Sequence, residues 1–153
     1  MPSLWRVTKR AHAATAFDGK AAARYGGRWN SPGHRVVYAS GTKSLALLEI
    51  LVHLDIGVPL PRFVAFNFEV DERAITRLPV ARLPREWRGA RGLAITRALG
   101  DDWLTSARSL VLAVPSAIVP EESNYLLNPL HPSWRRLRFG RPVPFLLDPR
   151  LAD

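Results

Sequence analysis

The chain of 153 residues contains no cysteine. This excludes a disulfide framework, a thiolate nucleophile and a cysteine-ligated metal centre. No apolar run is long enough to span a membrane, and the N-terminal segment lacks the apolar core of a signal peptide. We therefore expect a soluble cytoplasmic protein that has no membrane partner.

Several motifs of common enzyme classes are also missing. The sequence has neither the P-loop pattern GxxxxGK[ST] nor the dinucleotide-binding pattern GxGxxG. Its four histidines show no metal-ligand spacing such as HExxH, so we expect no metal. The absence of GxSxG disfavours a serine hydrolase.

What the chain has in excess is positive charge. It carries 22 lysines and arginines against 13 aspartates and glutamates, a formal net charge of +9, and only three of the cations are lysines. Such a balance predicts an anionic partner: nucleic acid, an acidic protein or a small molecule that bears phosphate. With 47% hydrophobic and 23% charged residues, the composition is that of one globular domain over residues 1–153.

Local patterns predict a mixture of strands and helices. Strands are expected over residues 3–9, 34–40, 62–70 and 109–120, with one or two more within 133–147. Helices are expected over 42–55, where Thr42 would cap the N-terminus, and over 92–104. Because strands and helices do not alternate regularly, we expect an α+β (mixed α/β) fold and not a doubly wound one.

The stretch GGRWNSPGHRVVYAS, residues 26–40, places Arg28 on a glycine-rich turn before a strand that ends near Tyr38. Glycines let the backbone approach a ligand closely, and arginine suits phosphate or carboxylate. The alternative interpretation is a surface turn with a solvated arginine.

Glu49 stands inside LALLEILVHL, residues 45–54. A helix that is apolar nearly all round is expected to be buried nearly all round, and burial would raise the pKa of a lone carboxyl. Such a group favours a functional site, whereas the alternative is a structural pair with His53 or with an arginine.

Taken together, these features suit NAD+. Arg28 would bind the pyrophosphate, Tyr38 offers a flat ring for nicotinamide, and Glu49 would stabilise a ribose oxocarbenium ion. Nicotinamide leaves as a neutral molecule, so one carboxylate is enough, unlike the carboxylate pair of ordinary glycoside hydrolysis.

Three blocks in order, GGRWNSPGHRVVYAS, SLALLEILVH and LAVPSAIVPEESNYLLNPLHP, resemble the RES-domain family over essentially the whole chain. The resemblance implies a fold like that of ADP-ribosyltransferase toxins, with a central bent or split mixed sheet and flanking helices. It implies the toxin of a toxin–antitoxin pair that consumes NAD+ by hydrolysis or phosphorolysis, or alternatively ADP-ribosylates a protein. It also implies a helix-turn-helix antitoxin of the Xre type, a toxin homodimer within a larger hetero-oligomer, and nucleic acid bound only through the antitoxin.

The resemblance also assigns residues. It implies that Arg28 holds the NAD+ phosphates, Tyr38 stacks on nicotinamide and Glu49 contacts the ribose. Ser116 matches the family serine, although a serine after proline is also a common turn former. Asn30 belongs to the same signature as a candidate NAD+ contact, with a bond to its own turn as the alternative.

Three further residues of these blocks have less specific expectations. Trp29 is expected to pack in the core. The roles of Asn124 and Asn128 stay open, with loop capping as the alternative.

A rival interpretation rests on SWRRLRFGR, residues 133–141, where Trp134 and Phe139 interleave with arginines. Basic residues with aromatic rings bind nucleic-acid backbones and stack on bases, which would suit an RNA-directed toxin. The alternatives are an amphipathic edge strand or a surface for an acidic partner. An interaction protein with an inactive site is disfavoured by the intact set of Arg28, Tyr38 and Glu49.

Overall fold

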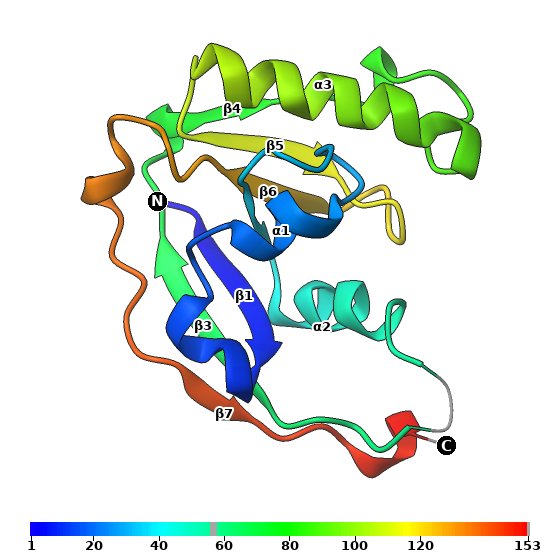
Figure 1. Cartoon of the computed structure of the whole chain (residues 1–153), viewed down its shortest axis with the longest axis vertical. Helices are drawn as coiled ribbons and strands as arrows, with labels where there is room; N and C mark the ends of the chain where they lie inside the picture. The colour runs from blue at the N-terminus through cyan, green and yellow to red at the C-terminus, as the bar shows by residue number, and fades with distance from the viewer. Residues whose placement is uncertain (56–57, 153) are drawn as a thin grey trace.

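A seven-stranded mixed sheet forms the centre of the protein, in a computed structural model that describes residues 1–55 and 58–152 (Figure 1). Its strands are β1 (Ser3–Lys9), β2 (Val37–Ser40), β3 (Phe63–Glu69), β4 (Ile75–Arg77), β5 (Val111–Pro115), β6 (Ser123–Leu127) and β7 (Val143–Phe145). They lie in the order β4-β5-β6-β2-β1-β3-β7, and of these neighbours only β4 and β5 pair in parallel. The expected α+β class with a mixed sheet is confirmed.

Three α-helices accompany the sheet within the described residues: α1 (Lys20–Tyr25), α2 (Lys43–Leu51) and α3 (Leu93–Ser106). Short 3-10 segments fill several of the connections. Across residues 1–55 and 58–152, no helix combines the length and the apolar character that crossing a membrane requires.

The sheet nearly separates between β1 and β2. These two strands share a single residue pair, Trp5 with Ser40, whereas β1 and β3 pair along seven residues. Arg6 on β1 bridges the gap where the two strands diverge, because its guanidinium donates to the carbonyls of Ala16 and Tyr38. Burial lowers the pKa of Arg6 to about 10. The expected split in the sheet is confirmed, and a buried cation holds its two halves together.

One face of the sheet is covered by two different helices. α2 packs on the half that contains β1 and β3, through Ala46 against Val7 and Phe63. α3 packs on the half that contains β5 and β6, through Trp103 against Leu112 (Figure 1). The part of this face that β2 and β6 form therefore lies between the two helices.

The helix predicted over residues 42–55 is α2, which is shorter and less buried than expected. Thr42 caps it as predicted, since its hydroxyl accepts from the Leu45 N–H at 3.1 Å. The expectation of burial nearly all round is wrong: Leu48 is 39% exposed and Val52 is 57% exposed. Because the helix rests on the sheet by one side only, Leu48 on its outer side and Val52 directly after its end face solvent.

The strand predicted over residues 109–120 is also wrong beyond Pro115. The chain turns at Ser116 and returns as β6, antiparallel to β5. The predicted set of elements omits α1, β4 and β6, of which β4 has only three residues. A three-residue strand is too short to show a period in the sequence.

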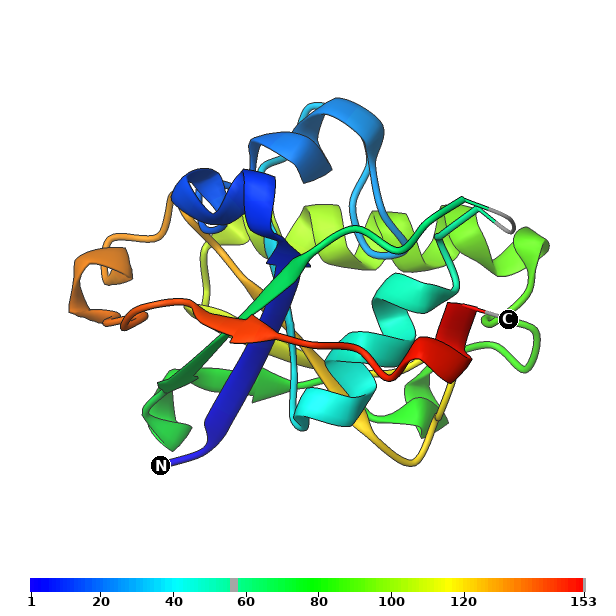
Figure 2. The same ribbon diagram turned by 90° about the horizontal axis from the view of Figure 1, so that it is seen from below.

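The segment of residues 133–147 contributes only β7, which lies along the outer edge of β3 (Figure 2). The edge strand considered for the basic residues is absent, because Trp134–Arg136 form a 3-10 turn. Phe139 stacks on Phe17 with ring centroids 3.7 Å apart and meets Phe68 edge-on. The rings of Trp134 and Phe139 are partly buried against the core, so they offer less surface for stacking on nucleic-acid bases than the sequence pattern suggests.

Candidate functional site

Glu49 is the centre of a polar cluster on the sheet face between α2 and α3. Its partners are buried, but Glu49 itself is only half-buried, so the expected full burial of this carboxylate is wrong. Its Oε1 accepts hydrogen bonds from Ser116 Oγ at 2.8 Å and from Asn124 Nδ2 at 2.6 Å. Asn124 Oδ1 in turn accepts from Ser40 Oγ at 2.6 Å. Within the described part of the chain Glu49 forms no ion pair, so the structural pair with His53 is wrong.

The turn after β5 places Ser116 against Glu49. Ser116 Oγ accepts from the backbone N–H groups of Ile118 and Val119, both at 3.1 Å, while it donates to Glu49. Ser116 is therefore a turn former and a partner of the glutamate at once. Its side chain is completely buried, so its contact in this conformation is with Glu49, and direct contact with NAD+ stays a prediction.

Tyr38 lies on the same face of β2 as Ser40, because side chains two residues apart on a strand point to the same side. Its hydroxyl donates to Asn30 Oδ1 at 2.6 Å and accepts from the Trp29 N–H at 3.1 Å. Burial raises the pKa of Tyr38, so the hydroxyl stays protonated at neutral pH. A Cβ at Gly27 would lie 2.7 Å from this hydroxyl, which explains the glycine before Arg28.

Arg28 is held by neutral groups. One of its terminal nitrogens donates to the Trp87 carbonyl at 3.2 Å, and its own carbonyl accepts from Thr96 Oγ1 at 2.6 Å. Among residues 1–55 and 58–152, no carboxylate lies within ion-pair distance of its guanidinium. The charge of Arg28 is therefore not neutralised by these residues, as an anion-binding residue requires.

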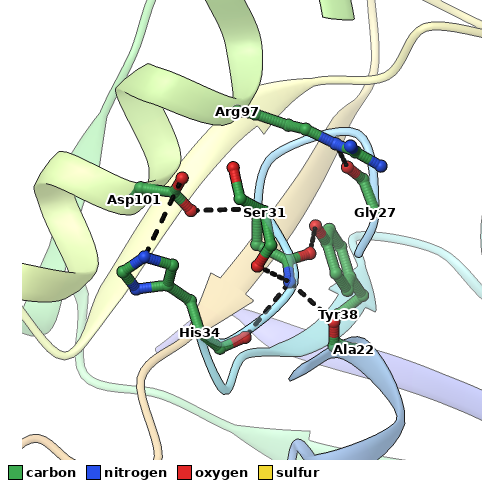
Figure 3. A network of polar contacts seen from close by, with 8 residues as sticks. Ala22, Gly27, Ser31, His34, Tyr38, Arg97 and Asp101 are labelled. Atoms are coloured by element: carbon green, nitrogen blue, oxygen red, sulfur yellow. Dashed lines mark hydrogen bonds and ion pairs between the residues drawn. The ribbon is translucent and has the colours of Figure 1, made fainter. Parts of the chain in front are cut away.

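One side of α3 fixes the turn that carries Arg28 (Figure 3). Arg97 Nε donates to the Gly27 carbonyl at 2.8 Å, and Asp101 Oδ1 accepts from the Ser31 N–H at 2.9 Å. Asp101 also lies 4.0 Å from the imidazole of His34. The turn is thus fastened at both ends to a single helix.

Asn30 lies in the interior of this turn. It is completely buried, and its Nδ2 donates to the carbonyls of Ala22 at 2.8 Å and His34 at 3.1 Å. The geometry favours the alternative that Asn30 bonds its own turn; direct contact with NAD+ is untested and would require the side chain to leave these partners. Trp29 packs in the core as expected, 2% exposed and next to Trp87.

The two asparagines with open roles differ. Asn128 caps a loop, since its Nδ2 donates to the Leu104 carbonyl and its Oδ1 accepts from the Leu130 N–H. Asn124 binds Glu49 instead. The sequence analysis also did not identify Ser40, whose signal was the two-residue spacing from Tyr38 along one strand.

Arg88 is another residue near the site that the sequence did not indicate. It donates from Nε to the Ala117 carbonyl at 2.7 Å and from Nη2 to the Ile118 carbonyl at 3.3 Å. Because Trp87 contacts Arg28, the segment 87–88 connects the arginine turn to the loop that carries Ser116. The groups predicted as one site are therefore linked by a continuous series of contacts.

Two cavities lie on the protein away from Glu49, Tyr38 and Arg28. One of about 340 Å³ is bordered by the segments 33–35, 104–107 and 128–130, and another of about 430 Å³ by Arg10, Ala11, Pro61 and Arg62. Neither is lined by Glu49, Tyr38 or Arg28. Within the described residues, no three His, Asp or Glu side chains gather as metal ligands would.

The fold and the site define a single α+β domain in which one sheet face carries a glutamate cluster beside an arginine-bearing turn. The same fold occurs in the crystal structure of the Mycobacterium tuberculosis MbcT–MbcA toxin–antitoxin complex, with a TM-score of 0.71 and 16% identity over 94% of this chain and 83% of that chain.

The model of the RES domain matches residues 3–148, so the chain belongs to the RES-domain family, as its sequence blocks predicted. The chain is 41% identical over 149 residues to the protein named Toxin Res from Yersinia enterocolitica serotype O:8 / biotype 1B, covering 97% of this chain and 98% of that protein. It is 37% identical over 155 residues to the Prs ADP-ribosylating toxin of Sphingobium sp. strain YBL2, covering 97% and 96% of the two chains.

Proposed function

We propose that this protein is the toxin of a toxin–antitoxin pair and that it breaks the bond between nicotinamide and ribose in NAD+. The observation that carries the proposal is the Glu49 cluster. Its carboxylate is held by two neutral donors and forms no ion pair with the described residues. A carboxylate held in this way keeps its negative charge for a developing cation.

The proposed chemistry needs one bond to break and one to form. The C1″–N1 bond of the nicotinamide riboside breaks, and its electron pair moves to the nicotinamide nitrogen, which becomes neutral. The ribose carbon acquires oxocarbenium character, and Glu49 stabilises that charge electrostatically. An acceptor oxygen or nitrogen then bonds to C1″ and releases its proton.

The neighbouring residues support binding of the rest of the substrate. Arg28 bears a charge that no described carboxylate neutralises, which suits the pyrophosphate. Tyr38 lies two residues from Ser40 on the same strand face, so its ring stands beside the Glu49 cluster, where nicotinamide would stack.

Three acceptors are consistent with this step: water, phosphate and a protein side chain. The Sphingobium relative is named an ADP-ribosylating toxin, which favours testing the protein acceptor alongside the other two. Purified protein incubated with NAD+ would yield ADP-ribose if water is the acceptor and ADP-ribose 1″-phosphate if inorganic phosphate is. Labelled NAD+ in a cell extract would mark a protein acceptor. Absence of all three products would contradict the proposal.

The partner that we propose is a helix-turn-helix antitoxin of the Xre type, bound to a homodimer of this chain. A site around Arg28 that lacks an acidic partner within the described residues is a receptor for an anionic tail. We expect the antitoxin to place a carboxylate against Arg28 and apolar residues near Tyr38, so that inhibition is competitive with NAD+.

Deleting the last few residues of the antitoxin is expected to restore NAD+ consumption while the complex still forms. The reason is that the antitoxin residues that occupy the site would differ from those that hold the complex together. Complex formation is measured by size-exclusion chromatography and activity by NAD+ loss. A truncated antitoxin that still inhibits fully would place the blockade outside the site, for instance at the arginines of residues 135–141.

The rival function, nucleic-acid binding, predicts a different response to salt. Arg135 and Arg136 are exposed, so a paired Arg135→Ala and Arg136→Ala variant removes phosphate contacts without touching Glu49. We expect this variant to keep NAD+ turnover, with little dependence on salt. Phosphate-driven RNA binding would instead weaken with a log–log slope of about −0.9 per duplex phosphate contact, or about −0.7 for a single strand. Tight RNA binding that the double substitution abolishes, with no NAD+ loss in expressing cells, would favour the rival.

A further inference from the structure

We infer that Asn124, held in place by Ser40, is a positioning residue that anchors one oxygen of Glu49 and leaves the other for the substrate. The inference rests on the proposed function for its kinetic consequences, but its geometry stands on the contacts of this chain. Ser40, Asn124 and Glu49 come from β2, β6 and α2, so the three elements around the site meet in this series of hydrogen bonds.

The orientation of the Asn124 amide follows from its two partners. The carboxylate of Glu49 accepts only, so the group facing it at 2.6 Å must be the Nδ2 donor. The Oδ1 on the other side then requires a donor, which Ser40 Oγ supplies at 2.6 Å. A flipped amide would set two acceptors against each other at Glu49. Glu49 therefore dictates which way the amide faces, and the Ser40 hydroxyl, by donating to Oδ1, holds the amide in that position.

Both donors converge on the same oxygen of Glu49. Ser116 Oγ and Asn124 Nδ2 each bind Oε1, and no hydrogen bond to Oε2 occurs within the described residues. A carboxylate fixed through one oxygen cannot rotate freely about its terminal torsion. The structure thus assigns Oε1 to the protein and Oε2 to the ribose.

The burial of the side chains that bind Glu49 and Asn124 supports the assignment of Oε1 to the protein and Oε2 to the ribose. Ser116 is completely buried, Ser40 is 4% exposed and Asn124 is 8% exposed, so water does not compete for these bonds. Hydrogen bonds to a charged acceptor in such surroundings are strong and directional. Because both donors are neutral, they hold the carboxylate without cancelling the charge that the reaction needs.

Charged or titratable groups stand around the cluster: His53 two residues after α2, Glu121 and Glu122 in the loop after Ser116, Arg88 in the facing loop, Tyr38 on β2 and Tyr125 on β6. Of these, none in the described residues forms an ion pair with Glu49. No ion pair seen in the described residues would therefore offset a second carboxylate placed beside Oε1.

The decisive variant is Asn124→Asp, which keeps the shape and puts a carboxylate about 2.6 Å from Glu49 Oε1. Two carboxylates at this distance share one proton. We expect turnover at pH 7 to fall at least about tenfold, because the shared proton neutralises the charge that the ribose needs, and to recover as the pH rises past the second apparent pKa of the pair. With ¹³C-labelled carboxyl groups and no NAD+ present, NMR should show a new transition above the ordinary range of glutamate.

Two further variants complete the test. Ser40→Ala keeps Asn124 but frees its amide, so kcat should fall several-fold with KM nearly unchanged. Asn67→Asp makes the same charge change at an exposed position of β3 and should leave the pH profile as in the wild type.

The results separate the inference from the proposed function. An unchanged ¹³C titration in a folded Asn124→Asp protein would overturn the inference. If that variant does not fold, an unchanged kcat in Ser40→Ala would overturn it instead. A wild-type protein that releases no nicotinamide, together with a shifted titration in Asn124→Asp, would refute NAD+ cleavage and leave the positioning intact.

Discussion

Replacing Glu49 with glutamine is expected to lower NAD+ turnover by about 10²–10³-fold while the protein stays folded. The glutamine carbonyl oxygen can still accept from Ser116 and Asn124, so the hydrogen-bonded cluster survives. What disappears is the negative charge opposite the oxocarbenium ion, and removing one electrostatic stabiliser typically costs about 2.7–4 kcal/mol. Initial rates of nicotinamide release measure the effect.

The matched control for this substitution is Glu69→Gln, at the exposed end of β3 and remote from the cluster. It changes the net charge equally and should turn over NAD+ at the wild-type rate. Circular dichroism and thermal melting establish that both variants are folded. A folded Glu49→Gln protein with wild-type turnover would remove Glu49 from the mechanism.

Replacing Gly100 with alanine is expected to destabilise the protein by about 3 kcal/mol or more, at the upper end of what overpacking costs. The helix α3 approaches the arginine turn so closely here that a Cβ would lie 1.7 Å from the Trp29 carbonyl oxygen. The Trp29 carbonyl belongs to the backbone, so it cannot move aside as the end of a flexible side chain can. For a domain of about 150 residues this corresponds to a fall in melting temperature of roughly 10 °C.

Gly89→Ala is the control, because a Cβ there would meet only the Glu86 carbonyl, at an ordinary 3.7 Å. This variant should melt within a degree or two of the wild type. Gly100→Ala should also lose activity disproportionately, since α3 fixes the turn of Arg28 through Thr96 and Arg97. A Gly100→Ala protein with unchanged melting and turnover would show that the close approach of helix and turn is not needed.

The sequence predicted those parts of the structure that depend on local pattern. β1 has the predicted bounds, residues 3–9, because the residues that favour strands, Trp5, Val7 and Thr8, gather in its middle. The cap at Thr42 follows from a hydroxyl directly before an apolar helix. The glycine-rich turn of Arg28 was recognisable because two adjacent glycines permit a positive φ and a close backbone approach, and the structure shows one at Gly26 and the other at Gly27.

The predictions that failed concern features that depend on tertiary contacts. The apolar residues of α2 do not reveal that Leu48 and Val52 face solvent, since burial depends on what packs against the helix. The partners of Glu49 are 67 and 75 residues away along the chain, and only the pairing of β2, β5 and β6 brings them together. Nothing in the local pattern around Asn124 distinguishes a partner of a carboxylate from a loop cap.

Release of nicotinamide from NAD+ by the purified protein tests the central claim most directly. Proton NMR follows free nicotinamide, in parallel with the Glu49→Gln variant at equal concentration. We predict that the wild type converts NAD+ to nicotinamide and an ADP-ribosyl product, and that Glu49→Gln does so at least about a hundredfold more slowly. NAD+ that stays intact with folded wild-type protein, in the presence of phosphate and of cell extract, would contradict the account.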